Sequence, residues 1–276
     1  MRLTSLTFLG TGGGRFATIY QIRSTGGIYI EDGIRIHLDP GPGALTNMRR
    51  LSLDPAKTDA ILISHCHPDH YVDAEVLLEG MVLGGFKKKG VLVGSPTVLE
   101  GRDNLGPCIS PYHRSLPERL IVARVGDEIR IMDMNISVTP TVHKDPYGVG
   151  FRFHTSNGDI SYVSDSEIAD EVVKAHRDTR VLILNLTRPI ASKVPRHLST
   201  EEAIEMVDDI GPEMTVLTHF GMKILHEGAD KQAKHIEERT GVRTVAAEDL
   251  MRVGVGKTAR VTRRGENRAT YNDPKG

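Results

Sequence analysis

Three histidines and an aspartate lie within six consecutive residues, His65-Cys66-His67-Pro68-Asp69-His70. Imidazole nitrogens and carboxylate oxygens are the ligands that zinc and related metals prefer. In an extended segment, the side chains of His65 and His67 point the same way because strand side chains repeat every two residues. The proline then bends the chain, so Asp69 and His70 face another direction. The spacing predicts one ion held by His65 and His67, with Asp69 and His70 turned to a second ion.

Further candidate ligands follow strand-like segments elsewhere in the chain. Residues 60–63, 136–142, 160–164 and 214–218 are rich in β-branched and apolar side chains, a pattern typical of strands. Just after these four segments come His65, His143, Asp165 and His219. Ligands at the ends of several strands can converge on one edge of a sheet, where loops carry function on a rigid scaffold.

This pattern resembles the metallo-β-lactamase superfamily of metal-dependent hydrolases. The resemblance covers about residues 3–255 and rests on the motif from Ser64 to His70, followed in the family's order by His143, Asp165 and His219. An upstream acidic motif, Leu38-Asp39-Pro40-Gly41-Pro42-Gly43, also matches. The resemblance implies two divalent metal ions as cofactors, zinc first, with manganese or iron as alternatives.

The resemblance also implies how the ligands are shared. The first ion would be held by His65, His67 and His143, the second by Asp69, His70 and His219, and Asp165 would bridge them. Asp39 would orient a ligand histidine from behind. From the residues alone, Asp39 could equally be a turn residue beside Pro40 and Gly41.

Strand-like and helix-like segments alternate along the chain, which indicates a mixed α/β class. A hairpin is expected over residues 26–39, with its turn at Asp32-Gly33, and a first strand over residues 3–9. Helices are expected over residues 71–81, 166–177 and 230–240, and a capping box at Ser199-Thr200-Glu201-Glu202 opens another that ends at Gly211-Pro212.

The resemblance implies a four-layer αββα sandwich, its two halves near residues 1–140 and 141–255. We predict one hydrolase domain, residues 1–255, followed by a basic C-terminal tail, residues 256–276. Such tails can bind RNA but are more often frayed, solvated ends. The run Gly10 to Arg15 is not a P-loop, because no Gly-Lys-Ser/Thr follows; it could cradle a phosphate, but a strand-to-strand loop passing close to the site is the favoured interpretation.

Composition agrees with a soluble enzyme. The 276 residues carry 35 basic and 36 acidic side chains, so no general attraction to nucleic acid or to an anionic membrane follows. The only two cysteines, Cys66 and Cys108, form no CxxC pair, which favours a reducing compartment. Residues 3–9 are too short and too polar for a signal peptide or a membrane span. We expect a cytoplasmic protein with no membrane partner; a homodimer is compatible with the sequence.

The loop over residues 187–199 brings three cations and a histidine to the expected site edge. Its candidate substrate-binding residues are Arg188, Lys193 and Arg196, and the candidate catalytic residues are His197 and Asp69. The run from His197 to Ala203, ahead of Leu217-Thr218-His219-Phe220, looks like the phosphodiesterase branch of the superfamily, which includes ribonuclease Z and a cyclic-phosphate phosphodiesterase. There the equivalent histidine sits by the scissile phosphate. From the residues alone, His197 could be a loop histidine near a helix N-terminus.

Ribonuclease Z usually carries a long glycine- and proline-rich arm that grips tRNA, and this chain has no such insertion. The prediction is therefore a dinuclear metal-dependent phosphodiesterase acting on a small or flexible phosphodiester: a cyclic phosphate, a nucleotide or an RNA end. The alternatives are a lactonase or thioesterase on the same fold, a tRNA 3′-end-processing endoribonuclease, a di-iron reductase and a non-catalytic RNA-binding module. A di-iron reductase usually needs a flavin-bearing domain, for which 276 residues leave no room. Intact ligands argue against the binding module.

Overall fold

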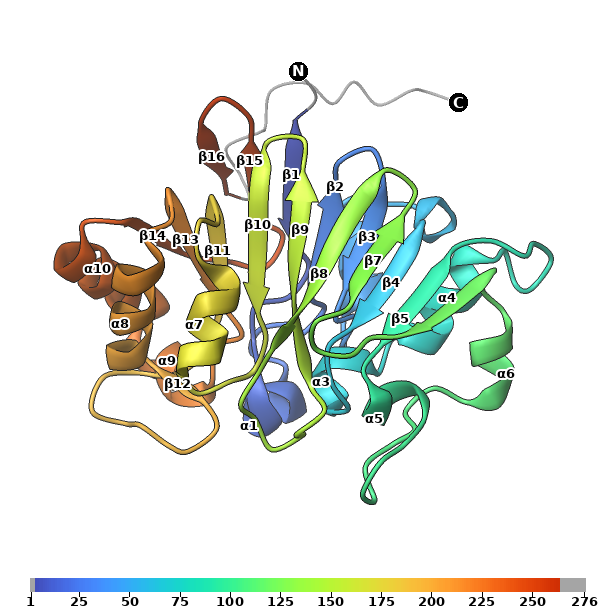
Figure 1. The fold of residues 1–276 in the computed structure, drawn as a ribbon, viewed down its shortest axis with the longest axis horizontal. Helices are drawn as coiled ribbons and strands as arrows, with labels where there is room; N and C mark the ends of the chain where they lie inside the picture. Colours follow the sequence, from blue (N-terminus) through green and yellow to red (C-terminus); the bar gives the residue numbers. More distant parts are fainter. Residues whose placement is uncertain (1–2, 264–276) are drawn as a thin grey trace.

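The computed structural model describes residues 3–263. Two β-sheets face each other and carry helices on their outer surfaces (Figure 1). The first sheet has the strand order β16 (Ala259–Thr262), β15 (Arg252–Val255), β1 (Thr4–Phe8), β2 (Ile28–Glu31), β3 (Arg35–Leu38), β4 (Ala60–Ile63), β5 (Val91–Gly94), β6 (Arg119–Val122). The second has the order β14 (Arg243–Ala246), β13 (Met214–Thr218), β11 (Val181–Arg188), β10 (Gly158–Val163), β9 (Val149–Thr155), β8 (Met134–Pro140), β7 (Glu128–Ile131), with β12 (Leu198–Ser199) paired to β11.

Helices complete the two outer layers. The first sheet is covered by α2 (Ala44–Arg50), α4 (Ala74–Met81) and α5 (Pro96–Leu99). The second is covered by α7 (Asp170–His176), α8 (Thr200–Ile210), α9 (Met222–Glu227) and α10 (Ala229–Thr240). Short helices in the connections are α1 (Gly14–Tyr20), η1 (Pro55–Lys57), α3 (Pro68–Tyr71) and α6 (Pro111–Ser115). The expected αββα sandwich is confirmed.

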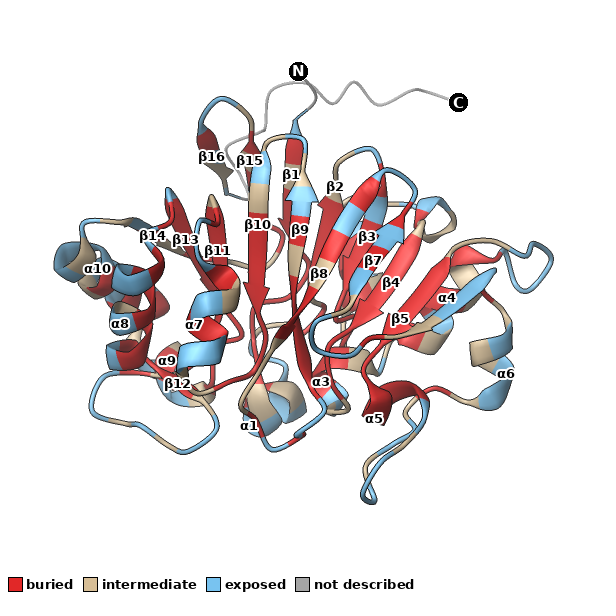
Figure 2. Ribbon diagram, viewed as in Figure 1, coloured by how far each residue is buried: buried red, intermediate tan, exposed pale blue. Residues whose placement is uncertain are grey.

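The central strands are apolar on both faces because each sheet is buried on both sides. Along β4, Ala60 and Leu62 pack into the core between the sheets, whereas Ile61 and Ile63 pack under the helices. The same alternation divides β11 between the inner core and the layer beneath α8. Figure 2 shows this burial as nearly continuous red along these strands.

Local signals in the sequence located several elements. The expected first strand and hairpin are present as β1 and as antiparallel β2 and β3. Helix α8 opens with the predicted capping box, in which the Ser199 hydroxyl accepts from the Glu202 amide, and it ends at Gly211 in the left-handed conformation. The expected helix over residues 230–240 is α10, which ends at Gly241.

Two expected helices begin elsewhere. The helix over residues 71–81 is divided into α3 and α4, and the carboxylate of the intervening Asp73 accepts hydrogen bonds from the amides of Gly43 and Leu45. The helix expected from residue 166 begins only at Asp170. Before it, the Ser166 hydroxyl accepts from the Val142 amide, so this segment fixes a neighbouring loop instead of forming a first helical turn.

The predicted halves also need correction. Strands β7 and β8 already belong to the second sheet, and β15 and β16 return to the first, where β15 pairs with β1. The predicted domain end at residue 255 therefore falls inside the β15–β16 hairpin, and Ala259 lies in the inner core. The remainder of the predicted tail, residues 264–276, lies outside the described residues. Alternating strands and helices reveal the elements but not which sheet each strand joins.

No helix within residues 3–263 is both long enough and apolar enough to span a membrane. Both cysteines are free thiols, and the Cys108 sulfur lies 3.8 Å from the Cys66 carbonyl oxygen.

Buried His176 provides a test of how this packing depends on pH. Its ring is fully enclosed, neither ring nitrogen has a hydrogen-bond partner in the described part of the chain, and burial together with the nearby Arg152 charge lowers its pKa from 6.5 to about 3. The unfolded chain takes up a proton below about pH 6.5, whereas the folded chain does so only near pH 3. Stability is therefore lost as the pH falls through this window.

We expect His176→Leu, similar in volume, to remove this loss. Its advantage in unfolding free energy over the wild type should grow by up to about 2 kcal/mol between pH 6.5 and pH 5. Urea unfolding of chelator-treated protein measures the difference, with His226→Leu, at an exposed helix position, as the matched control. A difference independent of pH would contradict the expectation.

Candidate metal centre

All seven predicted ligands meet at one edge of the sandwich. Strands β10, β11 and β13 are parallel, and β8 runs with them because β8 and β10 are both antiparallel to β9. Their carboxyl ends, with that of β4, lie at the edge occupied by α1 and α3 (Figure 1). This edge holds two groups of donor atoms: His65, His67, His143 and Asp165 in one, and Asp69, His70 and His219 in the other.

In the first group, the ring nitrogens converge on a common point. The Nδ1 atom of His67 lies 2.9 Å from Nε2 of His65 and 3.1 Å from Nε2 of His143. The Oδ2 atom of Asp165 is 3.8 Å from the same His143 nitrogen. Ligands at ~2.0–2.1 Å from a tetrahedral zinc ion are separated by ~3.3 Å, so these spacings suit one ion.

The second group is equally compact. The Nε2 atom of His219 lies 3.1 Å from Nε2 of His70, 3.1 Å from Oδ2 of Asp69 and 3.2 Å from Oδ1 of Asp165. The two oxygens of Asp165 thus face different groups, Oδ2 the first and Oδ1 the second. This is the arrangement that a carboxylate shared between two ions requires.

In His143 and His70, a hydrogen bond from Nδ1 leaves Nε2, the nitrogen that faces the other donor atoms, available for a metal. The Nδ1 atom of His143 lies 2.8 Å from the Arg196 carbonyl oxygen, and Nδ1 of His70 lies 2.8 Å from a carboxylate oxygen of Asp39. Only a protonated nitrogen can bond to such acceptors, so in the neutral rings the Nε2 lone pairs point inward. Several lone pairs aimed at one another repel unless a cation lies between them. The donor set therefore fits metal ions.

Asp39 lies at the centre of a hydrogen-bond network behind His70. Its Oδ2 atom also accepts from the hydroxyls of Ser64 and Tyr162, each at 2.7 Å, and its Oδ1 atom accepts from the Ser64 amide at 2.7 Å. The residue is buried and has a positive φ of 50°. Four hydrogen bonds keep the carboxylate fixed behind His70.

The charges around the donor atoms favour binding of a cation. Burial alone would lower the pKa of His70, but the carboxylates of Asp39 and Asp69 outweigh it and raise that pKa to about 10. Burial and the surrounding histidines together push the pKa of His65 well below 6.5. The pKa of Asp165 is depressed because the neighbouring histidines outweigh its burial. Asp165 thus stays ionised and His65 neutral, as metal ligands must be, whereas His70 would have to release a proton to bind an ion.

The glycine loop after β1 closes the second group. The Gly14 amide donates to Oδ2 of Asp69 at 2.7 Å. A Cβ on Gly13 would lie 2.2 Å from the His219 ring, so only glycine fits there. The loop passes close to the site as expected, but it leads into α1, not into a second strand.

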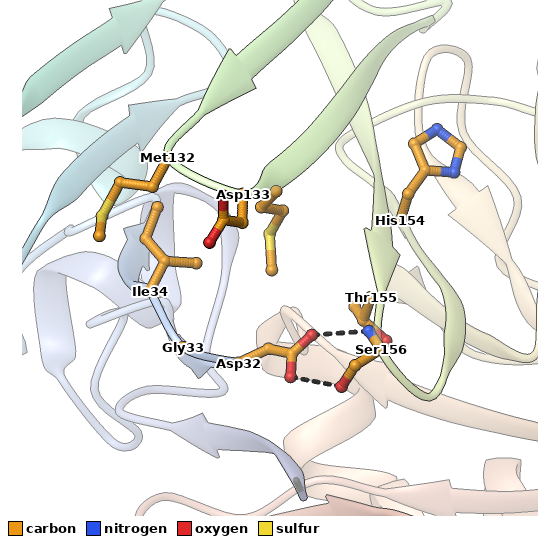
Figure 3. Close-up of a pocket in the computed structure, with 9 residues that line it drawn as sticks. Asp32, Gly33, Ile34, Met132, Asp133, His154, Thr155 and Ser156 are labelled. Atoms are coloured by element: carbon orange, nitrogen blue, oxygen red, sulfur yellow. Dashed lines mark hydrogen bonds between the residues drawn. The ribbon is translucent and has the colours of Figure 1, made fainter. Parts of the chain in front are cut away.

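A cavity of about 480 Å³ opens over the donor atoms. Three of the seven donor residues, His67, Asp69 and Asp165, line it. The lining also includes Arg15, Phe16, Ile19, Lys144, Arg188 and His197. A second cavity, of about 320 Å³, lies between Asp32 and Met132 near the β2–β3 turn and contains none of the predicted site residues (Figure 3).

The three cationic side chains of the loop over residues 187–199 make different contacts. Arg188 lines the main cavity, and its buried Nε atom has no hydrogen-bond partner among residues 3–263. The Lys193 ammonium instead pairs with Glu202 at 2.7 Å. The Arg196 guanidinium lies 3.8 Å from the Glu167 carboxylate. The backbone carbonyl of Arg196 accepts the hydrogen bond from the His143 ring described above. Neither Lys193 nor Arg196 lines the cavity, so the structure gives no support to their predicted substrate contact.

His197 does line the cavity. Its Nδ1 atom lies 4.0 Å from Oδ2 of Asp165, and its ring centre is 5.0 Å from that of His143. Burial outweighs the attraction of Asp165 and lowers the pKa of His197 to about 4. The ring is therefore neutral at pH 7.

Sequence reasoning missed several residues that the structure brings to the site. Asn185 donates to Oδ1 of Asp165 at 2.9 Å, and Lys144, next to His143, lines the cavity. A polar residue inside the apolar run Val181–Leu186 was an available signal for Asn185. Phe16 gave no such signal, because an aromatic residue in a short helix is usually buried.

Comparisons with known proteins agree with this geometry. The family model described as a beta-lactamase superfamily domain matches residues 34–220. An uncharacterized protein from Methanocaldococcus jannaschii is 39% identical over 245 residues, covering 88% of this chain and 91% of that protein. Ribonuclease Z from Pyrobaculum neutrophilum is 38% identical over 88 residues, which are 31% of this chain and 30% of that protein. The solved structure of a diphosphatase from the PhnP family, 19% identical, superposes with a TM-score of 0.69 over 90% of this chain and 96% of that chain.

The chain belongs to the metallo-β-lactamase superfamily of metal-dependent hydrolases. Its relatives include a ribonuclease Z, a member of the branch that the run from His197 to Ala203 resembles.

The shared position of Asp165 generates a prediction about metal content. Protein purified without chelator should contain close to two ions per chain by elemental analysis. Asp165→Ala should lose metal and hydrolytic activity together, because one side chain serves both donor groups. Asp208→Ala, an exposed aspartate on α8, should change neither. Retention of both ions and full turnover in Asp165→Ala would show that the assignment is wrong.

Proposed function

We propose that the protein is a dinuclear metal-dependent phosphodiesterase acting on a small or flexible phosphodiester. The observation that carries the proposal is a single cavity lined by members of both donor groups, by three cationic side chains without an ion pair among residues 3–263, and by a histidine outside the ligand set. Bound together, two divalent ions, zinc in the first instance, would supply an activated water and neutralise charge on a phosphate. The proposed ligands are His65, His67 and His143 for one ion, Asp69, His70 and His219 for the other, and Asp165 for both.

The cations of the cavity are suited to phosphate oxygens. Arg188 and Lys144 line the cavity, and neither has an ion pair with a carboxylate among residues 3–263. A guanidinium can donate two parallel hydrogen bonds to a phosphate, which fixes its orientation. These two residues thus replace Lys193 and Arg196 as the proposed substrate contacts.

His197 is proposed to contact the phosphate or to protonate the leaving oxygen. Its neutral ring retains one N–H donor in the free protein, and a bound phosphate anion would favour uptake of a second proton. Asp69, held by the Gly14 amide, lines the same cavity and completes the proposed catalytic pair.

The relatives support phosphoester chemistry without fixing the substrate. One is a ribonuclease, and RNA is joined by phosphodiesters; a solved neighbour that shares the fold is a diphosphatase. The test is a panel of bis-p-nitrophenyl phosphate, cyclic nucleotides, lactones and thioesters assayed with defined metals. Faster turnover of lactones or thioesters than of any phosphodiester would contradict the proposal and leave the metal centre intact.

The proposed role of His197 predicts a leaving-group dependence. His197→Ala should retain its metal, while kcat for an alkyl phosphodiester falls ~10²–10⁴-fold, the usual effect of losing a general acid. The loss should be smaller for p-nitrophenolate, which needs little protonation. His226→Ala, which changes an exposed histidine, is the control. An unchanged kcat on the alkyl ester would exclude His197 from the mechanism.

The proposed substrate size predicts a weak dependence on salt. A large polyanion bound through many phosphate contacts loses affinity steeply as salt rises, whereas a small phosphodiester makes only one or two such contacts. KM for the best substrate should therefore change only modestly between low and physiological salt. Efficient cleavage of precursor tRNA with a steep salt slope would favour the tRNA-processing alternative.

A further inference from the structure

Helix α1 exposes apolar side chains beside the candidate metal centre. Phe16 is 61% exposed, Ile19 62% and Tyr20 67%, although the helix has only seven residues. Exposed apolar side chains that cluster in this way commonly mark a binding surface.

The helix is held firmly against the site. Its first residue, Gly14, donates its amide to Asp69 at 2.7 Å. Ala17 is buried on the inner side. Because these contacts fix the inner face of α1, its outer side chains occupy a defined position relative to the donor atoms.

Two of the exposed side chains share the cavity with the site. Phe16 and Ile19 line it together with Asp69, Arg188 and His197. Its volume of about 480 Å³ lies within the ~300–1,000 Å³ usual for sites of small ligands. The same cavity therefore offers cationic side chains suited to a phosphate and exposed apolar side chains suited to an apolar group.

We propose that Phe16 is a stacking platform for the nucleobase of a nucleotide phosphodiester, a claim that rests on the function proposed above. An exposed phenyl ring offers a flat face that any base can cover, and this needs no hydrogen-bond partners. The open cavity leaves the polar edges of the base in contact with water. An aliphatic substituent would gain little from a flat ring in particular, so a base is the better match.

The test compares three p-nitrophenyl phosphodiesters that share one leaving group: the methyl, hexyl and thymidine 5′-esters. The wild type should prefer the thymidine ester. Phe16→Ala should lower kcat/KM for it about 5- to 150-fold, the range for loss of one base–aromatic stack. The methyl ester should change less than about twofold, and Phe16→Trp should restore the preference.

A binding measurement makes the test independent of turnover. Calorimetry of the metal-loaded protein should show that Phe16→Ala weakens binding of thymidine 5′-monophosphate but not of inorganic phosphate. Phe86→Ala is the matched control, because Phe86 is 92% exposed and does not line this cavity. Neither ligand's affinity should change in that variant.

Several results would overturn the inference. These are an equal loss for the methyl and thymidine esters, a preference for the hexyl ester, or unchanged nucleotide binding in Phe16→Ala. Conversion of a dimer to a monomer by the same variant, seen by sedimentation, would assign α1 to a contact between copies. Failure of the proposed function looks different: no phosphodiester would be hydrolysed although lactones or thioesters are, and the calorimetry would still decide the role of Phe16.

Discussion

The carboxylate of Asp39 is the interaction on which the site depends. It accepts hydrogen bonds from Ser64 after β4 of the first sheet, from Tyr162 on β10 of the second, and from His70. A buried carboxylate is costly unless its oxygens are well satisfied, and here four donors satisfy them. The same bonds hold the two sheets together at the edge where the donor groups meet. The same hydrogen bonds therefore fix the packing of the two sheets at this edge and orient a metal ligand.

A second polar chain continues from this point through the other sheet. Asn185 on β11 donates both to Oδ1 of Asp165 and to the Tyr162 hydroxyl, which itself donates to Asp39. Each member is buried and hydrogen-bonded to the next, so displacement of one disturbs its neighbour. The backbone is strained at the same place, because Asp39 and His219 both have positive φ, at 50° and 59°. Neighbouring contacts must stabilise such backbone conformations, as is common where a side chain has to be aimed.

The sequence predicted what depends on residue type and short spacing. The His65 to His70 motif and the polar residues after three other strands gave all seven members of the donor set, because carboxyl ends of parallel strands meet at one edge. The capping box located α8 because its signal is contained in four residues. The sheet to which each strand belongs could not be predicted, because no local pattern in residues 128–140 indicates which sheet they join. The pairing of Lys193 with Glu202 and the exposure of Phe16 depend on the whole fold, and long side chains carry little information about their partners.

The closure of the first sheet has a consequence for how the chain matures. Strand β1 lies between β2 and β15, and the loop after β1 bonds to the segment around Phe220, with Gly12 bridging to that residue. During synthesis, the first 200 residues emerge with the β15 side of β1 unpaired and without His219. The histidine motif thus exists long before the chain can enclose metal. Late contacts of such long sequence separation slow folding, so a nascent chain would spend time with an open sheet edge beside metal-binding histidines.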